Sequence, residues 1–530
     1  MTRNEINSPK IFLALVSGFM LTAAFPKIGA DWLAWVALLP LLIAIKNLSP
    51  KKSFSLGLLT GFVHFLTLVY WLINTMKTFG NLPLYICIPV LFLLCGIMAL
   101  YVALFSASLT YLTSSAIGCL LMVPVLWVAF EYLRALLFTG FPWEILGYSQ
   151  VHRLALIQMA DLFGVYGVSF LIAFINGSLF LILLFLLHGD WHGTHPTKHV
   201  LSLSILVAVI LLAIVISYGK WRIKTVDRLV SQAPSKRVTV VQGNIDQAVK
   251  WDPAFQISTT KKYLKLSLSA KTDKPDLVVW PETATPFYFL YNIQLSKLIL
   301  KGIRDTQSGF LIGSPSFVPR EEGEEYYNSA YLLDRNGKVK GKYNKAHLVP
   351  FGEYVPLKKW LPFVGKMVQE VGDFQPGQKG ASIDWGKYKL GIQICYEIIF
   401  PGLSRAMVQN DASLLVNITN DAWYGFSSMP YQHFSMSIFR ALENRRALVR
   451  SANTGISGFI DPVGRVIGRT ELFKEAVLSR SVPLLNTISI YTRVGDLLPL
   501  ICLIITLIAG LFLLQKRYKK EKAINTRGDG

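Results

Sequence analysis

The sequence predicts a polytopic α-helical membrane domain joined to one globular α/β domain. Two observations predict this fold class: eight apolar runs, and a polar region of more than 250 residues between the seventh run and the eighth. With 52% hydrophobic residues in a chain of 530, the composition excludes an ordinary soluble protein. We expect three segments: 1–220 with seven transmembrane helices, 221–494 as an extracytoplasmic domain, and 495–530 with an eighth transmembrane helix and a basic cytoplasmic tail.

The apolar runs approach the length that a membrane span requires, which is about 20 residues for a helix crossing the hydrocarbon core. The first run resembles a signal peptide, but six further runs follow at once, which favours an uncleaved first span. The runs lie near residues 11–26, 31–45, 54–75, 84–105, 117–138, 163–187, 200–218 and 495–515.

Lysine and arginine residues in the short loops predict the orientation, because cytoplasmic loops retain them. In an eight-span chain one side holds twelve of these residues and the other side only Lys27, Lys77 and Arg153. We therefore expect both termini in the cytoplasm of a bacterium, with 221–494 in the periplasm beside the inner membrane. Much of the net charge of +21 then comes from the Lys and Arg residues that set the orientation, and the remaining charge can face anionic lipid headgroups. We expect no nucleic-acid partner.

Polar residues inside the apolar runs are costly in a bilayer, so each needs a reason. Glu131 and Arg134 are three residues apart on one helix face, which predicts a buried structural pair, with a substrate contact as the alternative. Four histidines lie in the loop 188–199, but Pro196 breaks their spacing and the loop is on the cytoplasmic side. We expect no metal and no cofactor.

Short apolar strands alternate with helices in the polar region, which is typical of an α/β domain. Polar residues follow several of these strands directly, at the end where ligands bind in open α/β sheets. These residues are Gln242–Asn244, Glu282, Cys395–Glu397 and Asn420–Asp421. The expected strands are 237–242, 276–280, 310–313, 327–333 with a returning hairpin strand, 390–395, 413–418 and 455–460, and the expected helices are 257–270, 295–306 and 432–450.

Cys395 is the one cysteine of five that lies outside the apolar runs, so its own domain offers no disulfide partner. A free thiol in an oxidising compartment risks oxidation, which favours a reactive role over a plain core residue. A cysteine nucleophile needs a base and a donor for the oxyanion. Glu282 is a carboxylate that could act as the base, and it follows Pro281 at the end of a strand. Lys345 is a cation that could stabilise the oxyanion, and it lies in an otherwise apolar loop. Each of the two alone could also be a surface charge.

Together the segments around Glu282, Lys345 and Cys395 resemble the nitrilase superfamily, whose Glu-Lys-Cys triad acts on carbon-nitrogen and ester acyl groups. The resemblance covers residues 235–485 and includes Tyr396-Glu397 and the segment 443–455. It implies a four-layer α-β-β-α sandwich for this domain.

With seven spans before this domain and one after it, the whole chain is similar to the apolipoprotein N-acyltransferase family, a membrane-bound branch of the same superfamily. The local similarity is strongest at 242–245, 251–253, 343–356 and 420–425. The resemblance implies a glycerophospholipid acyl donor and a diacylglyceryl apolipoprotein acceptor, and we expect a monomer in the lipid bilayer. It implies that Glu282 is the general base, Lys345 the oxyanion stabiliser and Cys395 the nucleophile, with Glu353 and Glu397 as supporting carboxylates and Trp251, Tyr396 and Trp423 shaping a lipid-facing pocket.

An enzyme whose acyl donor and acceptor both reside in the bilayer needs membrane spans, whereas a soluble amidase does not. A membrane-tethered nitrilase-type amidase acting on a small amide is the first alternative, and it predicts one dispensable anchor. A transporter or channel with a regulatory domain is the second, and it predicts more charged or broken spans. Five aromatic residues are candidates for a water-excluding pocket, with a plain core or interfacial belt as the alternative: Trp251, Phe351, Trp423, Tyr424 and Phe426.

Overall fold

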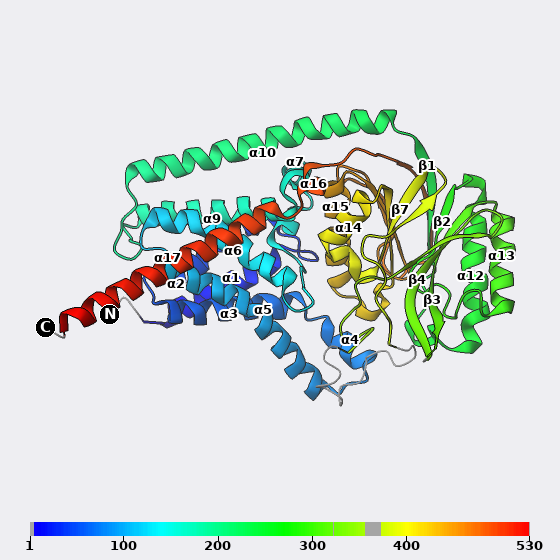
Figure 1. Ribbon diagram of the computed structural model, residues 1–530, viewed down its shortest axis with the longest axis horizontal. Helices are drawn as coiled ribbons and strands as arrows, with labels where there is room; N and C mark the ends of the chain where they lie inside the picture. The colour runs from blue at the N-terminus through cyan, green and yellow to red at the C-terminus, as the bar shows by residue number, and fades with distance from the viewer. Residues whose placement is uncertain (1–4, 322, 356–372, 529–530) are drawn as a thin grey trace.

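The computed structural model describes residues 5–321, 323–355 and 373–528. A region of apolar helices forms one end of the molecule and an α/β domain the other, and both termini lie at the end of the helical region away from the α/β domain (Figure 1). The helices of this region are α1 (Ser8–Ala23), α2 (Leu39–Ile45), α3 (Pro50–Leu68), α4 (Leu72–Thr78), α5 (Leu84–Leu112), α6 (Ala116–Leu136), α7 (Leu154–Ile157), α8 (Ala160–Phe163), α9 (Val165–Leu186), α10 (Lys198–Gln232) and α17 (Leu497–Gly528).

Among the described residues, five helices are long and apolar enough to cross a membrane: α5, α6, α9, α10 and α17. α3 and α4 add a sixth candidate if they are counted as one span bent by 55°. α1 and the segment Asp31–Ile45 are apolar but shorter, at 10–17 residues. The predicted runs are therefore helical, whereas the predicted number of eight transmembrane helices is not confirmed. The predicted domain boundary at residue 220 falls inside α10, which continues to Gln232.

The break between α3 and α4 is stabilised by a residue from the α/β domain. Gln432, on α15 (Met429–Asn444), is buried and donates from its amide nitrogen to the backbone oxygens of Leu68 and Pro26, at 3.3 Å each. Its amide oxygen accepts from the indole nitrogens of Trp71 at 3.2 Å and Trp143 at 2.9 Å. Gln432 thus satisfies backbone and indole groups in three separate segments of the helical region, which fixes how the two regions meet.

Substituting Gln432 with leucine is expected to destabilise the protein by about 2–3 kcal/mol, because the two indole donors and the Leu68 carbonyl lose a buried partner. Chemical denaturation of the purified protein in detergent measures this change. Gln256→Leu is the matched control, since the partly exposed Gln256 amide donates to Pro286 alone, and its cost should stay below about 1 kcal/mol. Equal costs for the two variants would contradict a bridging role.

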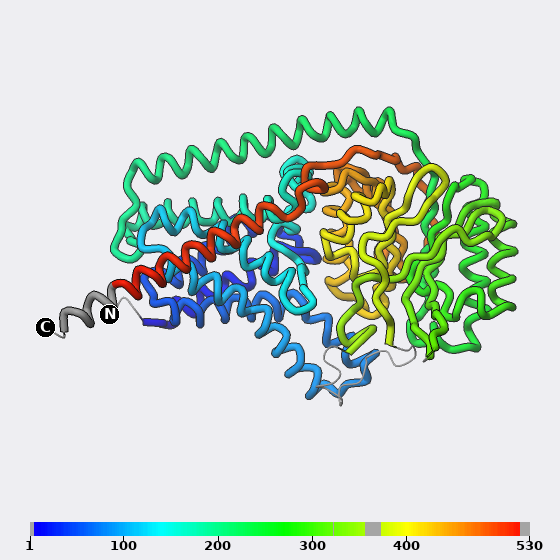
Figure 2. Tube along the Cα trace, in the orientation of Figure 1, coloured from blue at the N-terminus to red at the C-terminus, as the bar shows by residue number. Residues whose placement is uncertain are grey.

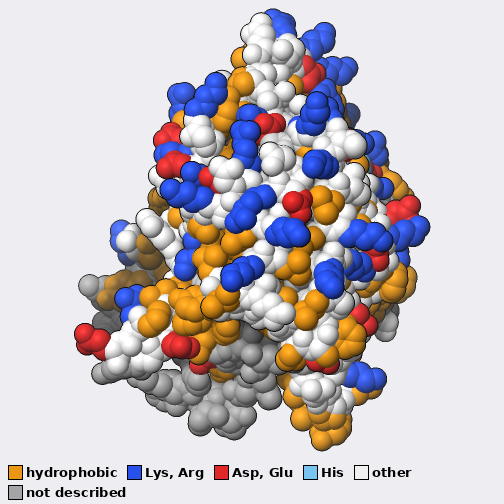
Figure 3. All heavy atoms as spheres, turned by 90° about the vertical axis from the view of Figure 1, so that its right-hand side faces the viewer, with side chains coloured by type: hydrophobic (Ala, Val, Ile, Leu, Met, Phe, Trp, Pro, Cys, Tyr) orange, Lys and Arg blue, Asp and Glu red, His pale blue; other side chains and the backbone are white. Residues whose placement is uncertain are grey.

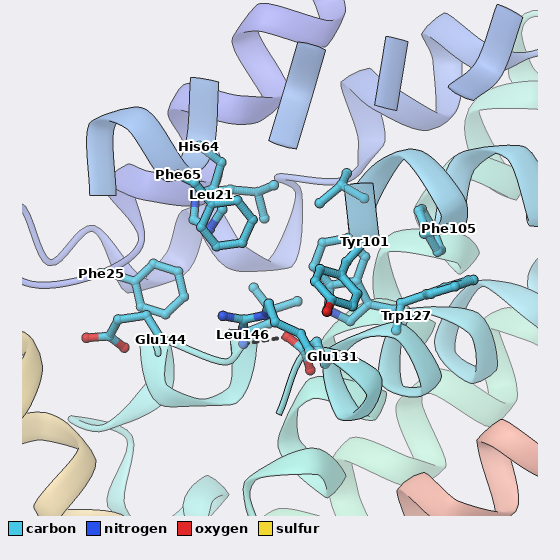
Figure 4. Close-up of a pocket in the computed structure, with 13 residues that line it drawn as sticks. Leu21, Phe25, His64, Phe65, Tyr101, Phe105, Trp127, Glu131, Glu144 and Leu146 are labelled. Carbon is cyan, nitrogen blue, oxygen red and sulfur yellow. Dashed lines mark hydrogen bonds between the residues drawn. The ribbon is translucent and has the colours of Figure 1, made fainter. Parts of the chain in front are cut away.

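Glu131 and Arg134 do not pair with each other in the described structure. Glu131 Oε1 accepts from the backbone nitrogen of Leu146 at 2.7 Å, and Arg134 Nη1 donates to the backbone oxygens of Phe141 and Trp143 at 3.0 and 2.7 Å. The predicted ion pair is therefore wrong, because the loop after α6 brings backbone partners closer. Glu131, His64 and Glu144 face one small cavity of about 30 Å³ between the helices (Figure 4).

The α/β domain contains two six-stranded mixed sheets, in the orders β12-β1-β2-β3-β4-β5 and β11-β10-β9-β8-β7-β6. The parallel pairs lie in the middle of each sheet, β1-β2-β3 in the first and β7-β8-β9 in the second. The strands are β1 (Ser235–Gln242), β2 (Leu277–Val279), β3 (Gly309–Arg320), β4 (Gly323–Leu333), β5 (Val339–Asn344), β6 (Ser382–Trp385), β7 (Tyr388–Ile394), β8 (Ala412–Thr419), β9 (Ala447–Ala452), β10 (Gly458–Ile460), β11 (Val466–Arg469) and β12 (Ala476–Pro483).

The two sheets lie between two layers of helices, which gives the four-layer order expected from the resemblance (Figure 1). α12 and α13 cover the first sheet, and α14 and α15 lie between the second sheet and the helical region. β1 and β12 pair along their length, so the chain enters the domain from α10 and leaves it toward α17 at the same edge (Figure 2). The helices of this domain are α11 (Gln247–Lys250), α12 (Gln256–Ser269), α13 (Ile293–Thr306), α14 (Pro401–Gln409), α15 (Met429–Asn444) and α16 (Ile490–Val494).

The predicted helix 432–450 ends earlier than expected. α15 stops at Asn444 because Arg445 adopts a left-handed conformation with φ 51°, and the chain then enters β9. Arg446 therefore lies outside the helix, and its buried guanidinium donates to the backbone oxygen of Ala412. β9 is a central strand and buried on both faces, so it lacks the alternation that marks a half-exposed strand.

Basic side chains are spread over the end of the α/β domain that is farthest from the apolar helices (Figure 3). Exposed lysines on α12 and α13 contribute to this charge, and they are Lys261, Lys265, Lys297 and Lys301. The expectation that the non-topological charge can face lipid headgroups stays a prediction.

Candidate active site

Glu282 lies just beyond β2, a three-residue strand that is fully buried, and Pro281 prevents the strand from continuing. The carboxylate of Glu282 is nearly buried and accepts two hydrogen bonds. Asn328 Nδ2 donates to Oε1 at 2.8 Å, and the backbone nitrogen of Asn420, at the end of β8, donates to Oε2 at 3.0 Å. One carboxylate therefore joins the carboxyl-terminal ends of strands from both sheets.

Lys345 follows β5 directly, and its side chain is buried between two carboxylates. Its Nζ lies 3.0 Å from Glu353 Oε2 and 3.7 Å from Glu282 Oε1. Asn328 Nδ2 donates to both carboxylates, at 2.8 Å each, and holds them side by side. Burial alone would lower the pKa of Lys345, but Glu353 and Glu282 together outweigh burial and raise it, so this lysine is a fixed cation.

Cys395 occupies the first position after β7, where its backbone has φ 53°. This left-handed conformation is costly for a residue with a side chain, by about 1–2 kcal/mol. The surrounding structure offsets that cost: His433 Nε2 donates to the backbone oxygen of Cys395 at 3.2 Å, and Asn417 Nδ2 approaches the same oxygen at 3.4 Å. Backbone strain that is held in place by hydrogen bonds is frequent at functional sites.

A buried network behind Cys395 keeps His433 neutral. Arg450 Nη2 donates to His433 Nδ1 at 2.9 Å and to Asp421 Oδ2 at 2.9 Å, and all three side chains are fully buried. Burial together with the guanidinium of Arg450 lowers the pKa of His433, which leaves Nε2–H to donate to Cys395. The guanidinium of Arg450 outweighs the effect of burial and lowers the pKa of Asp421, so this residue carries the negative charge of the network.

The sulfur of Cys395 rests as a neutral thiol. Burial, reinforced by the negative charge of Glu282, raises the pKa of Cys395 to about 12, and Lys345 offsets only part of this shift. Lys345 favours the thiolate, but burial and Glu282 outweigh it in the resting site. A neutral thiol requires a base during attack, and Glu282 is a carboxylate beside it in the same pocket.

Glu282, Lys345 and Cys395 line one pocket of about 180 Å³, together with Glu353, Trp251 and Trp423. Part of the pocket wall comes from the helical region, where α4 contributes Leu72 and Thr75, and Phe79 follows directly after this helix. Thr75 Oγ1 donates to the backbone oxygen of Trp423 at 3.0 Å, and the ring of Phe79 meets the Trp423 ring edge-on with centroids 4.8 Å apart. The arm formed by α4 thus positions the loop after β8.

Two predicted supporting residues lie behind the pocket rather than in its wall. Glu397 is fully buried and accepts from the backbone nitrogens of Ala346, His347 and Ile394, so it holds the Lys345 loop against β7. Tyr396 packs edge-on against Phe400 and does not line the pocket. Of the five aromatic candidates, Trp251, Trp423 and Tyr424 line the pocket, whereas Phe351 and Phe426 are exposed and do not.

Sequence patterns missed several residues of this site. Asn328 and Lys250 line the same pocket, and His433 and Arg450 form the network behind the thiol. Each is a single polar residue inside a strand or helix, without a local motif. A polar residue facing inward within an apolar strand, such as Arg450 in β9, was the one available signal.

Comparison with known proteins identifies two families along the chain. Residues 17–178 match the apolipoprotein N-acyltransferase N-terminal domain, and residues 237–490 match carbon-nitrogen hydrolase. Among solved structures, an amidase from Nesterenkonia sp. aligns over 49% of this chain and 94% of its own, with 19% identity and a TM-score of 0.35.

Full-length relatives share both regions. The apolipoprotein N-acyltransferase of Geobacter metallireducens is 45% identical over 491 residues, which is 92% of each chain. That of Haemophilus influenzae is 33% identical over 495 residues, covering 92% of this chain and 91% of its own. That of Rickettsia typhi is 33% identical over 475 residues, covering 87% and 90%. The resemblance found in the sequence is confirmed, and the chain belongs to the apolipoprotein N-acyltransferase family.

Proposed function

We propose that the protein transfers an acyl chain from a glycerophospholipid to the α-amine of the N-terminal diacylglyceryl-cysteine of apolipoproteins. The observation that carries this proposal is the pocket itself, in which Cys395, Glu282 and Lys345 share walls with α4, the second half of the bent candidate span α3–α4. A nucleophile whose pocket is partly built by a candidate membrane span suits a substrate that arrives from lipid. A small soluble amide would need no such wall.

In the first half of the reaction, Glu282 accepts the proton of the Cys395 thiol as the sulfur attacks the ester carbonyl carbon of the phospholipid. The carbonyl oxygen becomes an oxyanion, and the ammonium of Lys345 stabilises it because this cation is fixed and shielded from water. Collapse breaks the ester C–O bond. The leaving alkoxide takes the proton from Glu282 and departs as a lysophospholipid, and a thioester remains on Cys395.

In the second half, the free α-amine of the acceptor attacks the thioester carbonyl while Glu282 takes up its proton. Lys345 stabilises the second oxyanion, and collapse forms the amide and expels the Cys395 sulfur, which regains the proton from Glu282. Water competes for the thioester at this stage. Trp251, Trp423 and Tyr424 form apolar walls around the thiol and favour transfer over hydrolysis by limiting the access of water.

The same proposal includes the setting of the enzyme. The protein is a monomer in the bacterial inner membrane, with both termini in the cytoplasm and the catalytic domain in the periplasm. The excess of Lys and Arg in the loops on the side of the termini supports this orientation. Both termini lie at the end of the molecule away from the catalytic domain, which agrees with it (Figure 1).

A transfer assay tests the function. The purified protein is incubated in vesicles with phospholipid labelled in its acyl chains and a synthetic peptide that begins with diacylglyceryl-cysteine. We expect mass spectrometry to find the labelled chain as an amide on the peptide's α-amine, and no labelled product from the same peptide with an acetylated amine. Release of ammonia from small amides, without any acylated peptide, would instead support the membrane-tethered amidase.

A further inference from the structure

Two neighbouring side chains in the active-site pocket, Lys250 and Trp251, have hydrogen-bond donors that are not fully used. Lys250 is 2% exposed, and its Nζ donates to the backbone oxygen of Glu282 at 3.2 Å. Within the described residues it forms no ion pair with a carboxylate. The next residue is Trp251, whose indole nitrogen is buried with no partner among the described residues. Buried donors without partners are rare in folded proteins, so the indole nitrogen of Trp251 needs an explanation. An ammonium has three N–H donors, so the single acceptor of Lys250 leaves capacity for a further one.

Lys250 is the second buried cation near the thiol, and among the described residues no carboxylate lies within ion-pair distance of its ammonium. Lys345 lies within 4 Å of both Glu282 and Glu353, which neutralise it. Burial lowers the pKa of Lys250 to about 8 against the attraction of Glu282, whose carboxylate does not contact the ammonium directly. An ammonium buried in this way is stabilised by an anion that enters with the substrate.

Lys250 and Trp251 line the pocket of about 180 Å³ that also holds Cys395. Both donors belong to the short segment of α11 and the residue that follows it, so they are adjacent along the pocket wall. A ligand that satisfies them carries negative oxygen atoms and lies next to the ester that Cys395 attacks. A phosphodiester joined to an acylated glycerol has this arrangement, because few bonds separate its phosphorus from the ester carbonyl.

We propose that Lys250 and Trp251 bind the phosphate of the acyl donor. This assignment rests on the proposed function. It means that the site recognises the glycerol phosphodiester of the donor rather than the headgroup attached to the phosphate. The ammonium of Lys250 makes a charge-assisted hydrogen bond to one phosphate oxygen, and the indole N–H of Trp251 donates to another. The phosphate leaves with the lysophospholipid, which frees both donors before the acceptor binds.

Single-turnover acylation of Cys395 tests the site. The purified full-length protein receives either phosphatidylglycerol or a diacylglycerol with the same acyl chains, and intact-protein mass spectrometry measures the rate of thioester formation. We expect Lys250→Met to lower the ratio of the phosphatidylglycerol rate to the diacylglycerol rate by about 10- to 100-fold, the range for a hydrogen bond to a charged group. Trp251→Phe keeps the ring and should lower the same ratio by a few fold.

Lys261→Met is the matched control, because Lys261 is exposed on α12 and should leave both rates unchanged. If Lys250→Met does not fold, Trp251→Phe and Lys250→Arg still report the ratio. If the ratio of the two acylation rates is unchanged in both Lys250→Met and Trp251→Phe, the proposal is overturned. In that case the two residues act on the structure of the pocket in general, which slows acylation by both lipids equally. Inorganic phosphate that inhibits the wild type but not Lys250→Met, with an unchanged lipid ratio, would assign the site to a free anion. A wild type that neither donor acylates would contradict the proposed function instead.

Discussion

Replacing Cys395 with alanine is expected to lower kcat for acyl transfer about 10⁶-fold, to below detection, because a triad without its nucleophile retains only binding and electrostatic effects. The thioester should disappear together with the turnover. The measurement uses phospholipid with labelled acyl chains, and wild-type protein should carry label that neutral hydroxylamine removes. Cys395→Ala should carry none.

Cys502→Ala is the matched control for this experiment. Cys502 is a second buried free cysteine, in α17, and no residue of the active-site pocket comes from that helix. Its replacement removes one sulfur of similar burial and should leave labelling at the wild-type level. Equal labelling of Cys395→Ala and wild type would exclude Cys395 as the acyl carrier.

Replacing Lys345 with methionine is expected to affect both catalysis and stability. Transfer should fall by about 10²–10³-fold because the oxyanion loses its donor. The free energy of unfolding should fall by about 3–5 kcal/mol because the buried carboxylates of Glu282 and Glu353 lose their common cation. The assay is single-turnover acylation combined with chemical denaturation in detergent.

A second substitution separates the two effects. Lys345→Met combined with Glu353→Gln leaves one buried carboxylate fewer, so it should recover part of the stability without recovering the rate. Lys340→Met is the control, because Lys340 forms an exposed ion pair with Asp334 at 3.2 Å and its loss should cost about 0–1 kcal/mol with unchanged transfer. Recovery of transfer in the double variant would show that Lys345 acts through folding alone.

The parts of the fold that depend on local pattern were predictable from the sequence. The apolar runs became helices, and β1, β2, β7 and β8 formed close to the expected positions, because continuous apolar stretches bounded by polar residues mark buried elements. The edge strands β6 and β12 were not predicted. β12 pairs with β1, which is distant in the chain, whereas β6 is only four residues long and forms a short hairpin with β7. The break after Leu68 contains no glycine or proline, and Gln432, 364 residues further along, supplies its partner.

The candidate site also contains residues that local sequence predicts and residues that only the tertiary structure reveals. Glu282, Lys345 and Cys395 were found because each follows a strand within a distinctive segment, and Glu353 because it lies in the same loop as Lys345. Asn328, which joins two carboxylates, and His433, which supports the backbone of Cys395, are contacts made only by the tertiary fold. Tyr396 and Glu397 belong to the same sequence motif as Cys395 but do not line the pocket. Their position next to Cys395 in the sequence does not decide which way their side chains point.

The burial of α15 makes the two regions of this protein inseparable. Every residue of this helix except Tyr431 is buried, and its apolar side chains belong to one cluster that continues from the helical region into the second sheet. An excised α/β fragment would expose that face of α15 to water, and Gln432 would lose its partners Leu68, Trp71 and Trp143 in the helical region. The membrane region is therefore half of the tertiary structure of the enzyme, and this chain cannot be reduced to a free-standing catalytic module.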